Sequence, residues 1–400
     1  MNHSENVDHD AVLRARTMLL GSEQLSVVQQ VEAYRVLAKV SPAAYLPKLA
    51  AALTSYGYGV RRAGGTPEAA LALYVEAVEA ARRIDAAEPN RDKVLGNTLG
   101  SYERALFGAG RRAEGRAVCE EAAAVGWTER LANVLAEEGR HGEAAELHGR
   151  SARAVQSAGC FWATVPWVAE LAAAGRHEEA LAAFTGLVDD TRRRVKDEHL
   201  PPAHLVWELV HRARMLDDLG RREEGGADRR EALLALSSPS ESGGRSWWAT
   251  LFVLASRAEE PAASPEAPMP PFGAGLIQWS HDTRDAYLAG IPALAAETAR
   301  LTEAGRLLEA SAAHRRLTAR TAVGAEHRQF LFQDRLRPLF DEGVALARRL
   351  TAHPGTLSRA LTDRSMFLVT DGRYEDARTD LAEAIALLDG PTSPPIVTRT

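Results

Sequence analysis

The sequence predicts an all-α protein built from helical hairpins. A short motif recurs along the chain, in which an acidic residue stands four positions after a glycine, at Gly64, Gly110, Gly139, Gly175, Gly220, Gly305 and Gly372. Each glycine lies between two stretches whose apolar residues recur at intervals of three and four, which is typical of amphipathic helices. Aromatic residues make up only 6% of the chain and alanine is frequent. This composition favours closely packed helices over a β-sandwich.

The motif has a local physical basis. Glycine adopts the left-handed conformation at the end of a helix without the steric cost that a Cβ atom imposes. The acidic residue then falls in the first turn of the next helix, where the positive end of the helix dipole stabilises it. A small residue such as Ala144 or Ala180 often follows the acid and allows close helix packing. The motif therefore predicts a turn between two helices.

The chain divides into five segments by composition. The polar start and the end of the chain are expected to be tails, and two helical blocks are expected on either side of a proline-rich break. The expected boundaries are a disordered tail over 1–10, a block of helical repeats over 11–236, a loop, short helix and Pro-rich linker over 237–275, a second helical block with degenerate repeats over 276–390, and a tail over 391–400.

Local signals place the helices within these blocks. Ser41-Pro42 ends the first helical stretch, because the residue before proline is pushed out of the helical region. Thr66-Pro67-Glu68 combines an N-cap residue, a proline and an acid at a helix start. After the first stretch, five hairpins are expected in the first block, over 44–84, 92–124, 127–156, 161–195 and 202–236. The turn glycines are unevenly spaced, so the period is irregular.

Charge and hydropathy restrict the function. The formal net charge is -6 with acids and bases interspersed, whereas a nucleic-acid surface requires a concentrated basic face. No apolar run approaches the ~20 residues that span a bilayer. The first ten residues lack the basic and apolar regions of a signal peptide. We therefore expect a cytoplasmic protein that binds neither nucleic acid nor membrane.

No catalytic or metal-binding motif is visible. His204 and His211 share one helix face, as do His141 and His148, but each pair lacks a further ligand at the spacing of a metal site. No Walker sequence, His-Glu-x-x-His or Gly-x-Ser-x-Gly motif occurs. We accordingly expect no cofactor, no metal and no enzymatic activity.

The hairpins resemble the tetratricopeptide repeat (TPR) family. The last hairpin has Gly372, Tyr374, Ala377 and Ala384, followed by Pro391; the fourth has Trp167, Gly175, Ala180 and Phe184; and the first has Leu53, Tyr56, Gly57, Gly64 and Leu73. The resemblance covers about 44–236 and, more weakly, 285–390, and the segment 41–50 is similar to the openings of large actinobacterial proteins of this type. It implies a TPR-like α-solenoid, although the period departs from the family's usual length.

The resemblance implies a groove lined by the first helix of each hairpin, in which family members hold partner segments. The positions expected to face it are Ser55, Tyr58, Arg62, Asn97, Ser101, Arg104, Arg130, Asn133, His211 and Arg214. This set is polar and cationic, which suits a partner with carboxylate groups. The other interpretation of these positions is that they are simply solvated helix faces.

Three functions follow from these observations. The first is a non-enzymatic protein-interaction scaffold that binds a peptide or protein segment in this groove. An alternative is a regulatory sensor that binds a small effector or peptide and controls a partner protein. An enzyme of unknown type within 243–390 is the third alternative, and no motif supports it.

Overall fold

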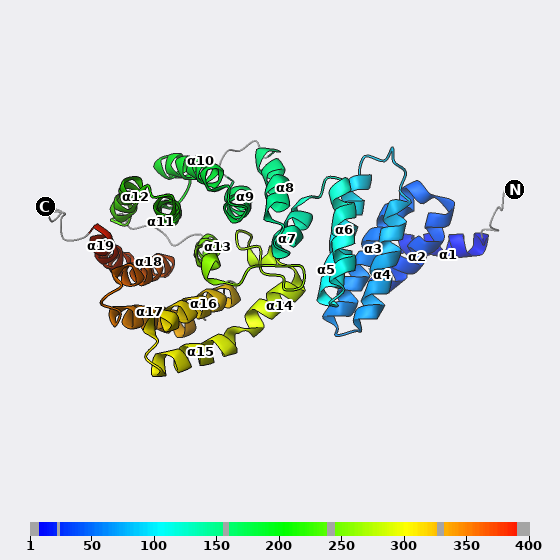
Figure 1. Cartoon of the computed structure of the whole chain (residues 1–400). Coiled ribbons are helices and arrows are strands. Elements are labelled where there is room, and N and C mark those ends of the chain that lie inside the picture. Colours follow the sequence, from blue (N-terminus) through cyan, green and yellow to red (C-terminus); the bar gives the residue numbers. More distant parts are fainter. Residues whose placement is uncertain (1–7, 22–24, 155–159, 238–244, 326–331, 390–400) are drawn as a thin grey trace. The chain divides into compact units, whose positions relative to one another are not determined.

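The computed structural model describes residues 8–21, 25–154, 160–237, 245–325 and 332–389. These residues form helices and connecting turns, and no strand occurs among them. The all-α prediction is therefore confirmed for this part of the chain. Helices that follow each other in sequence pack in adjacent pairs, such as α3 with α4 and α18 with α19 (Figure 1).

The chain forms two compact units. Unit 1 comprises Met1–Val134 with Ser280–Asp282, and unit 2 comprises Leu135–Trp279 with Thr283–Thr400. The division between the units thus falls inside the first predicted repeat block. The sequence had placed a boundary at the Pro-rich segment instead, which lies within unit 2.

Unit 1 contains α1 (His9–Leu20), α2 (Val27–Val40), α3 (Pro42–Arg62), α4 (Pro67–Arg82), α5 (Arg91–Gly108), α6 (Arg112–Ala124) and most of α7 (Glu129–Glu137). The predicted start of α4 is confirmed, since the Thr66 side chain accepts a hydrogen bond from the Ala69 N–H at 3.3 Å. Leu53, Tyr74 and Leu99 are almost fully buried in the core between α3, α4 and α5.

Unit 2 contains α8 (His141–Ala154), α9 (Phe161–Ala173), α10 (His177–Lys196), α11 (Pro202–Asp218), α12 (Arg222–Ala235), α13 (Arg245–Ser256), most of α14 (His281–Ala289), α15 (Ile291–Glu303), α16 (Leu307–Ala325), α17 (Arg337–Arg348), α18 (Pro354–Thr370) and α19 (Tyr374–Asp389). Short 3₁₀ turns occupy Arg257–Glu259 and Leu276–Gln278, and a π-helical turn, Phe332–Leu336, precedes α17.

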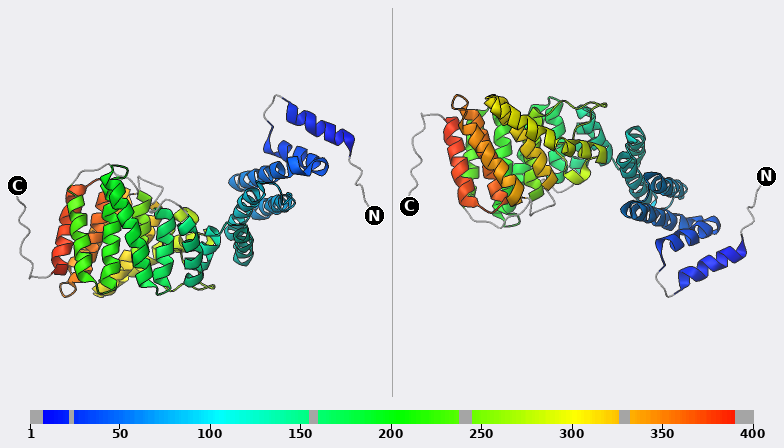
Figure 2. Two further views of the ribbon diagram at one scale, coloured as in Figure 1. Left: turned by 90° about the horizontal axis from the view of Figure 1, so that it is seen from above. Right: turned by 90° about the horizontal axis from the view of Figure 1, so that it is seen from below.

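The helices of unit 2 form two rows with α13 between them. One row runs from α8 to α12 and the other from α14 to α19, as Figures 1 and 2 show. The rows meet where α12 contacts α19 and α11 contacts α18. Helix α13 contacts α11, α16 and α18, and its Trp248 is 1% exposed in the core that all three share. The first helices of several pairs therefore face a common interior.

All seven predicted turn glycines have the left-handed conformation, with φ between 72° and 78°. Gly126 is an eighth, with φ 94°. The residue after the glycine donates its N–H to a carbonyl five positions earlier, as Arg111 does to Leu106 at 2.9 Å. This is a Schellman motif, which satisfies carbonyls at the helix end. The prediction of glycine-closed helices is confirmed at each of the seven positions.

The turns carry a second signal that the sequence analysis did not use. In six of them an arginine directly follows the glycine and pairs with the acidic residue three positions later. The pairs are Arg111–Glu114, Arg140–Glu143, Arg176–Glu179, Arg221–Glu224, Arg306–Glu309 and Arg373–Asp376. Because these pairs are exposed, each contributes little to stability, about 1 kcal/mol or less. The spacing of these Arg–acid pairs identifies the repeated turn in the sequence.

The Pro-rich segment is packed, although the sequence analysis expected an extended linker. Phe272 is 3% exposed, and a Cβ atom on Gly273 would lie 2.5 Å from the Cβ of Ala169 on α9. The Met269 N–H donates to the Glu137 carbonyl at 2.9 Å. Proline prevents a helix here, but it also removes N–H groups that burial would leave unsatisfied. Apolar residues between the prolines can therefore pack against α9.

The predicted tails differ in what the structure describes. Helix α1 begins at His9 with Asp8 as its N-cap, so the expected disordered tail over 1–10 overlaps a helix. Residues 1–7 and the tail over 391–400 lie outside the described residues, as does most of the loop after Ser237.

Candidate functional site

Six of the ten predicted site residues lie on one face of unit 1, which we call the α3/α5 face. It comprises Ser55, Tyr58 and Arg62 from α3, and Asn97, Ser101 and Arg104 from α5. Helices α3 and α5 contact each other, and residues three to four apart on each share a side. Tyr58 is 61% exposed, and the other five are exposed or, in the case of Ser101, half-buried. Three of these residues therefore share one side of α3 and three share one side of α5, and the two helices are in contact.

The arginines of the α3/α5 face have no ion pair within the described part of unit 1. Arg62 and Arg104 are both exposed, and Arg61 lies near Gly108, where an added Cβ would be 3.7 Å from the Arg61 Nη2. Gly59 and Gly100 leave open space on this face, since a Cβ there would meet no atom within 4 Å. The face is thus basic and shallow, with small residues between the cations.

Two arginines elsewhere in unit 1 are paired with glutamates on neighbouring helices. Arg35 on α2 binds both carboxylate oxygens of Glu76 on α4, at 2.5 and 2.6 Å. Arg82 on α4 binds Glu121 on α6 in the same bidentate way, at 2.6 and 2.8 Å. Arg62 and Arg104 thus differ from Arg35 and Arg82 in having no ion pair within the described residues.

Two further predicted residues of unit 1 have other environments. Arg130 donates to Glu103 at 2.9 Å, and Glu103 is 1% exposed, so this guanidinium is held by a buried carboxylate. Asn133 is itself 1% exposed, so its amide is not presented to solvent. Their position on α7 places both beside the core of unit 1 rather than on the α3/α5 face.

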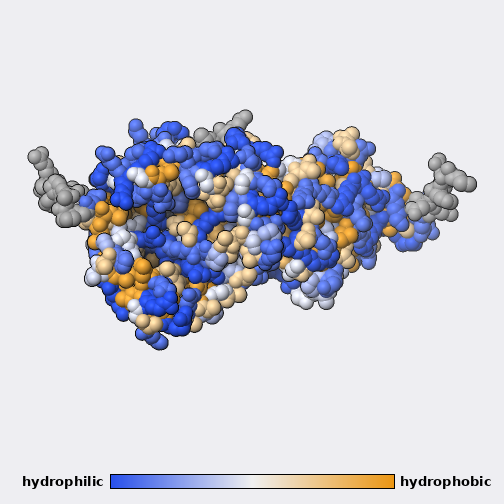
Figure 3. Space-filling model, in the orientation of Figure 1, coloured by the Kyte–Doolittle hydropathy of each residue, from blue (hydrophilic) through white to orange (hydrophobic). Residues whose placement is uncertain are grey.

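The last two predicted residues, His211 and Arg214, lie in unit 2. Both come from α11 and line a groove of about 1230 Å³. The groove is bounded by α9, α11, α16 and α18, with α13 and the following 3₁₀ turn at its base. Its apolar walls include Met215, Phe252 and Phe340. The molecular face drawn in Figure 3 is mainly hydrophilic, with smaller apolar areas over unit 2.

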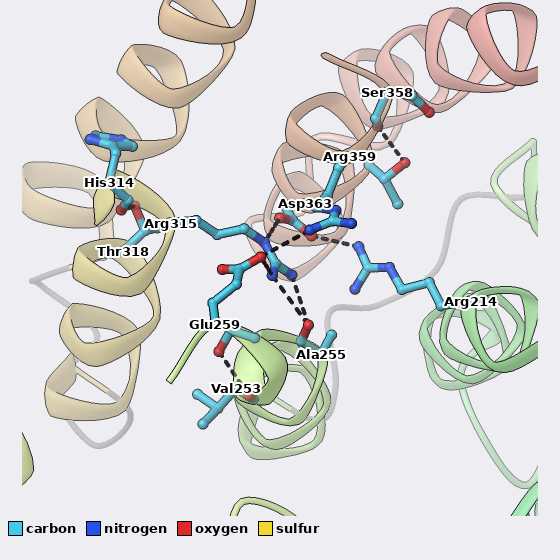
Figure 4. Close-up of polar contacts among 12 residues, drawn as sticks. Arg214, Val253, Ala255, Glu259, His314, Arg315, Thr318, Ser358, Arg359 and Asp363 are labelled. Carbon is cyan, nitrogen blue, oxygen red and sulfur yellow. Dashed lines mark hydrogen bonds and ion pairs between the residues drawn. The ribbon is translucent and has the colours of Figure 1, made fainter. Parts of the chain in front are cut away.

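A charged cluster lies at the base of this groove. Asp363 on α18 accepts hydrogen bonds from Arg214 at 2.5 Å and from Arg315 on α16 at 2.7 Å. Arg315 also donates to Glu259 at 2.7 Å and to the Ala255 carbonyl at 3.2 Å. Arg359 on α18 donates to Glu259 at 2.9 Å. Figure 4 shows the three guanidinium groups converging from three helices on the two carboxylates.

Burial and pairing act in opposite directions on these groups. Burial alone would raise the pKa of Asp363, but Arg315 and Arg214 outweigh it and hold that pKa below its usual value. Burial lowers the pKa of Arg214, Asp363 opposes this shift, and Arg315 and Arg359 add to it. Burial also lowers the pKa of His211 to about 3, so its imidazole is neutral at pH 7. Asp363 therefore stays ionised in the cluster.

A second network lies along the same groove. The His141 Nδ1 is 2.7 Å from Glu170, and Arg257 donates to the Ala169 carbonyl at 2.9 Å. Glu170 is 1% exposed; burial would raise its pKa, but His141 and Arg257 lower it overall. Arg257 directly follows α13, so this network ties the base of the groove to α9. It is saturated by its own partners and serves to fix the groove.

The sequence analysis found two residues of the groove and missed the rest. Arg315, Arg359, Asp363 and Glu259 belong to no recognisable motif and are separated from Arg214 by long stretches of sequence. Only the fold brings them to one place. A local signal, the acidic pair Glu259-Glu260 at the start of the Pro-rich segment, was present but carried no indication of its partners.

Comparison with protein-family models finds no match, and comparison with curated proteins finds none either. Within the described residues, no helix has both the length and the apolar character needed to cross a bilayer. The described part of the chain also brings no three His, Cys, Asp or Glu side chains together in a way that could hold a metal ion. The arguments for function therefore rest on the two surfaces themselves.

Proposed function

We propose that this chain is a TPR-like α-solenoid that acts as a non-enzymatic interaction scaffold and binds an acidic partner segment on the α3/α5 face. The observation that carries the proposal is that Arg62 and Arg104 are exposed and have no ion pair within the described residues. Arg62 lies one turn after the exposed Tyr58 on α3, Arg104 lies on α5, which contacts α3, and Gly59 and Gly100 on these helices leave room for an approaching chain.

The chemistry of this face favours carboxylates. A guanidinium group offers two parallel N–H donors that match the two oxygens of a carboxylate. Ser101 and Asn97 add hydroxyl and amide groups between the cations, although the Ser101 hydroxyl already donates to the Asn97 carbonyl at 3.1 Å. Tyr58 supplies an exposed aromatic surface of the kind that often anchors a partner. An extended segment with glutamate or aspartate residues could bind the arginines through its carboxylates and pack against the Tyr58 ring.

The test is a binding titration of the full chain with two fluorescent peptides, one of alternating Glu and Ala and one in which Gln replaces Glu. We expect only the acidic peptide to bind. Replacing Arg62 and Arg104 with Ala should weaken binding about tenfold, since each exposed arginine–carboxylate contact contributes up to about 1 kcal/mol.

A matched control is available in the same unit. Arg35 and Arg82 are 44% and 50% exposed in their side chains, but each is already paired with a glutamate. Replacing both with Ala should leave peptide binding unchanged. If the two double variants bind alike, or if the Gln peptide binds as well as the Glu peptide, the proposal fails.

The alternative of a regulatory sensor is favoured by one observation, the groove of unit 2. Its volume of about 1230 Å³ exceeds the roughly 300–1,000 Å³ of common small-ligand sites. Unit 2 could therefore hold an effector while unit 1 binds a partner. Stabilisation of the chain against heat by a small molecule would support this function.

A further inference from the structure

We propose that the groove of unit 2 binds a ligand with an apolar body and a carboxylate group, with the carboxylate held between Arg214 and Arg359. The binding step is independent of the α3/α5 face. If this chain is a regulatory sensor, the ligand proposed here is the chemical class of its effector.

The first argument is a charge count. The cluster contains three guanidinium groups, from Arg214, Arg315 and Arg359, and two carboxylates, from Asp363 and Glu259. One positive charge is therefore uncompensated within the cluster. Arg315, Asp363 and Glu259 are largely buried, and charges interact more strongly beside such groups than in open solvent, so an anion from outside would be attracted there.

The second argument is that the hydrogen-bonding capacity of two arginines is not used. Arg315 makes four hydrogen bonds, because its Nε binds Asp363, its Nη1 binds Glu259, and both terminal nitrogens reach the Ala255 carbonyl. Toward the residues that the structure describes, Arg214 donates through Nη2 alone, and Arg359 through Nη1 alone. A guanidinium group has five N–H donors, so both retain donors for a ligand.

Exposure separates the roles of the three arginines. The side chain of Arg315 is 11% exposed, whereas those of Arg214 and Arg359 are 27% and 58% exposed, and both line the groove. Arg315 thus holds α16, α18 and the turn after α13 together. Arg214 and Arg359 line the groove from α11 and α18, two helices that contact each other. The donors are therefore positioned before any ligand arrives, which reduces the entropic cost of binding.

Neighbouring residues restrict the ligand further. His211, one turn before Arg214 on α11, lines the groove, and its Nδ1 is buried without a hydrogen-bond partner in the described structure. Asp218, one turn beyond Arg214, is exposed and negatively charged, and so disfavours an anion at that end. The carboxylate is accordingly directed toward Arg359.

The walls of the groove account for the apolar body. Met215, Phe252, Leu254 and Phe340 line it next to the charged cluster. The Arg315 guanidinium lies 5.8 Å from the centre of the Phe252 ring, so charged and apolar surfaces are contiguous. A ligand that joins a carboxylate to an alkyl or aromatic group would contact both. Such a group could be a small organic acid or the C-terminus of a short apolar peptide.

Calorimetric titration of the full chain distinguishes these sources. The probes are octanoate and 4-phenylbutyrate for the small acids, and the peptide Ala-Leu-Leu-Phe with a free C-terminus. Octanamide and the amidated peptide are the neutral counterparts. Binding of either acid class with at least tenfold loss in the neutral form supports the proposal and identifies the source. No binding of any acid at millimolar concentration, or equal binding of the neutral forms, overturns it.

Two variants test the residues. Arg359→Ala and Arg214→Lys should each weaken binding of the acid at least tenfold, the second because lysine retains the charge but loses the planar donor pair. The matched control is Arg348→Ala, whose side chain is 55% exposed and paired with Glu383 away from the groove. It should bind within twofold of the unmodified chain. If Arg359→Ala, folded by circular dichroism, also binds within twofold, the assignment is wrong.

Discussion

Replacing Asp363 with Asn tests whether the charged cluster holds unit 2 together. Asp363 is 4% exposed and accepts hydrogen bonds from both Arg214 and Arg315. Removing one partner of a buried ion pair costs about 3–5 kcal/mol, because the other charge stays buried and uncompensated. Arg315 keeps Glu259, and Arg214 is 27% exposed to water, so the lower end of that range applies. We expect a loss of about 3 kcal/mol.

The measurement is the midpoint of thermal unfolding by circular dichroism. For a unit of this size, about 1 kcal/mol corresponds to roughly 2–4 °C, so Asp363→Asn should lower the midpoint by about 6–12 °C at pH 7. The control is Glu383→Gln, since Glu383 is 40% exposed and its pair with Arg348 is at the surface. That variant should shift the midpoint by less than about 3 °C.

The pH dependence gives a second, independent reading of the same prediction. The pKa of Asp363 is lowered in the folded chain, so its contribution to stability is present above the unfolded value of about 3.9 and is lost as the pH falls further. The difference between the unmodified chain and Asp363→Asn should therefore shrink below about pH 4. Equal shifts for Asp363→Asn and Glu383→Gln at pH 7 would refute the reasoning.

Two other predictions concern single positions. Burial raises the pKa of Glu208 to about 8, and its carboxyl is 0% exposed. The folded chain therefore loses stability as the pH rises from about 4.5 to 8. Glu208→Gln should raise the midpoint of thermal unfolding at pH 9 but much less at pH 5. An equal effect at both pH values would contradict this prediction. On α3, Gly57→Ala should destabilise the folded chain by about 1–3 kcal/mol, because the new Cβ would lie 2.9 Å from the buried Tyr74 ring. Gly59→Ala should instead stabilise it by about 0.5–1 kcal/mol, because the new Cβ meets no atom within 4 Å. Denaturant unfolding checks this pair, and a loss of stability in both would count against the packing argument.

Those features of the fold that depend on neighbouring residues were predictable from the sequence. The turn glycines, the first-turn acids and the Thr66 cap act within a few residues, so their patterns are readable without knowledge of tertiary structure. The same local logic explains why the helix pairs were found while the division between units was not. Units are defined by packing between distant helices, which a local motif does not report.

The charged cluster illustrates the limit most clearly. Arg214 and Asp363 are 149 residues apart, and Arg315 and Glu259 are 56 apart. Nothing in the sequence near any of them indicates a partner. The packed Pro-rich segment was missed for a related reason, since its prolines exclude a helix but do not reveal that Phe272 is buried against α9. The helices could therefore be located from the sequence, whereas the groove could be found only from the way the helices pack.

Arginines that pair with glutamates across helices differ from the arginines of the two proposed surfaces. Bidentate or close Arg–Glu pairs connect helices two apart in the chain, and the partners are 35 to 41 residues apart. These pairs are Arg35–Glu76, Arg82–Glu121, Arg192–Glu231 and Arg348–Glu383. Such pairs engage these arginines, whereas Arg62 and Arg104 have no ion pair within the described residues and Arg359 keeps N–H donors beside its pair with Glu259.

The local distribution of charge explains how a chain with a net negative charge can bind acidic ligands. The formal net charge of -6 would repel an anion at long range. At physiological ionic strength, however, interactions between exposed charges are screened beyond about 8 Å. An approaching carboxylate therefore responds to the charges within that distance. On the α3/α5 face these charges include Arg62 and Arg104. In the groove of unit 2 the three arginines of the charged cluster outnumber its two carboxylates, so both surfaces can select anions despite the sign of the whole chain.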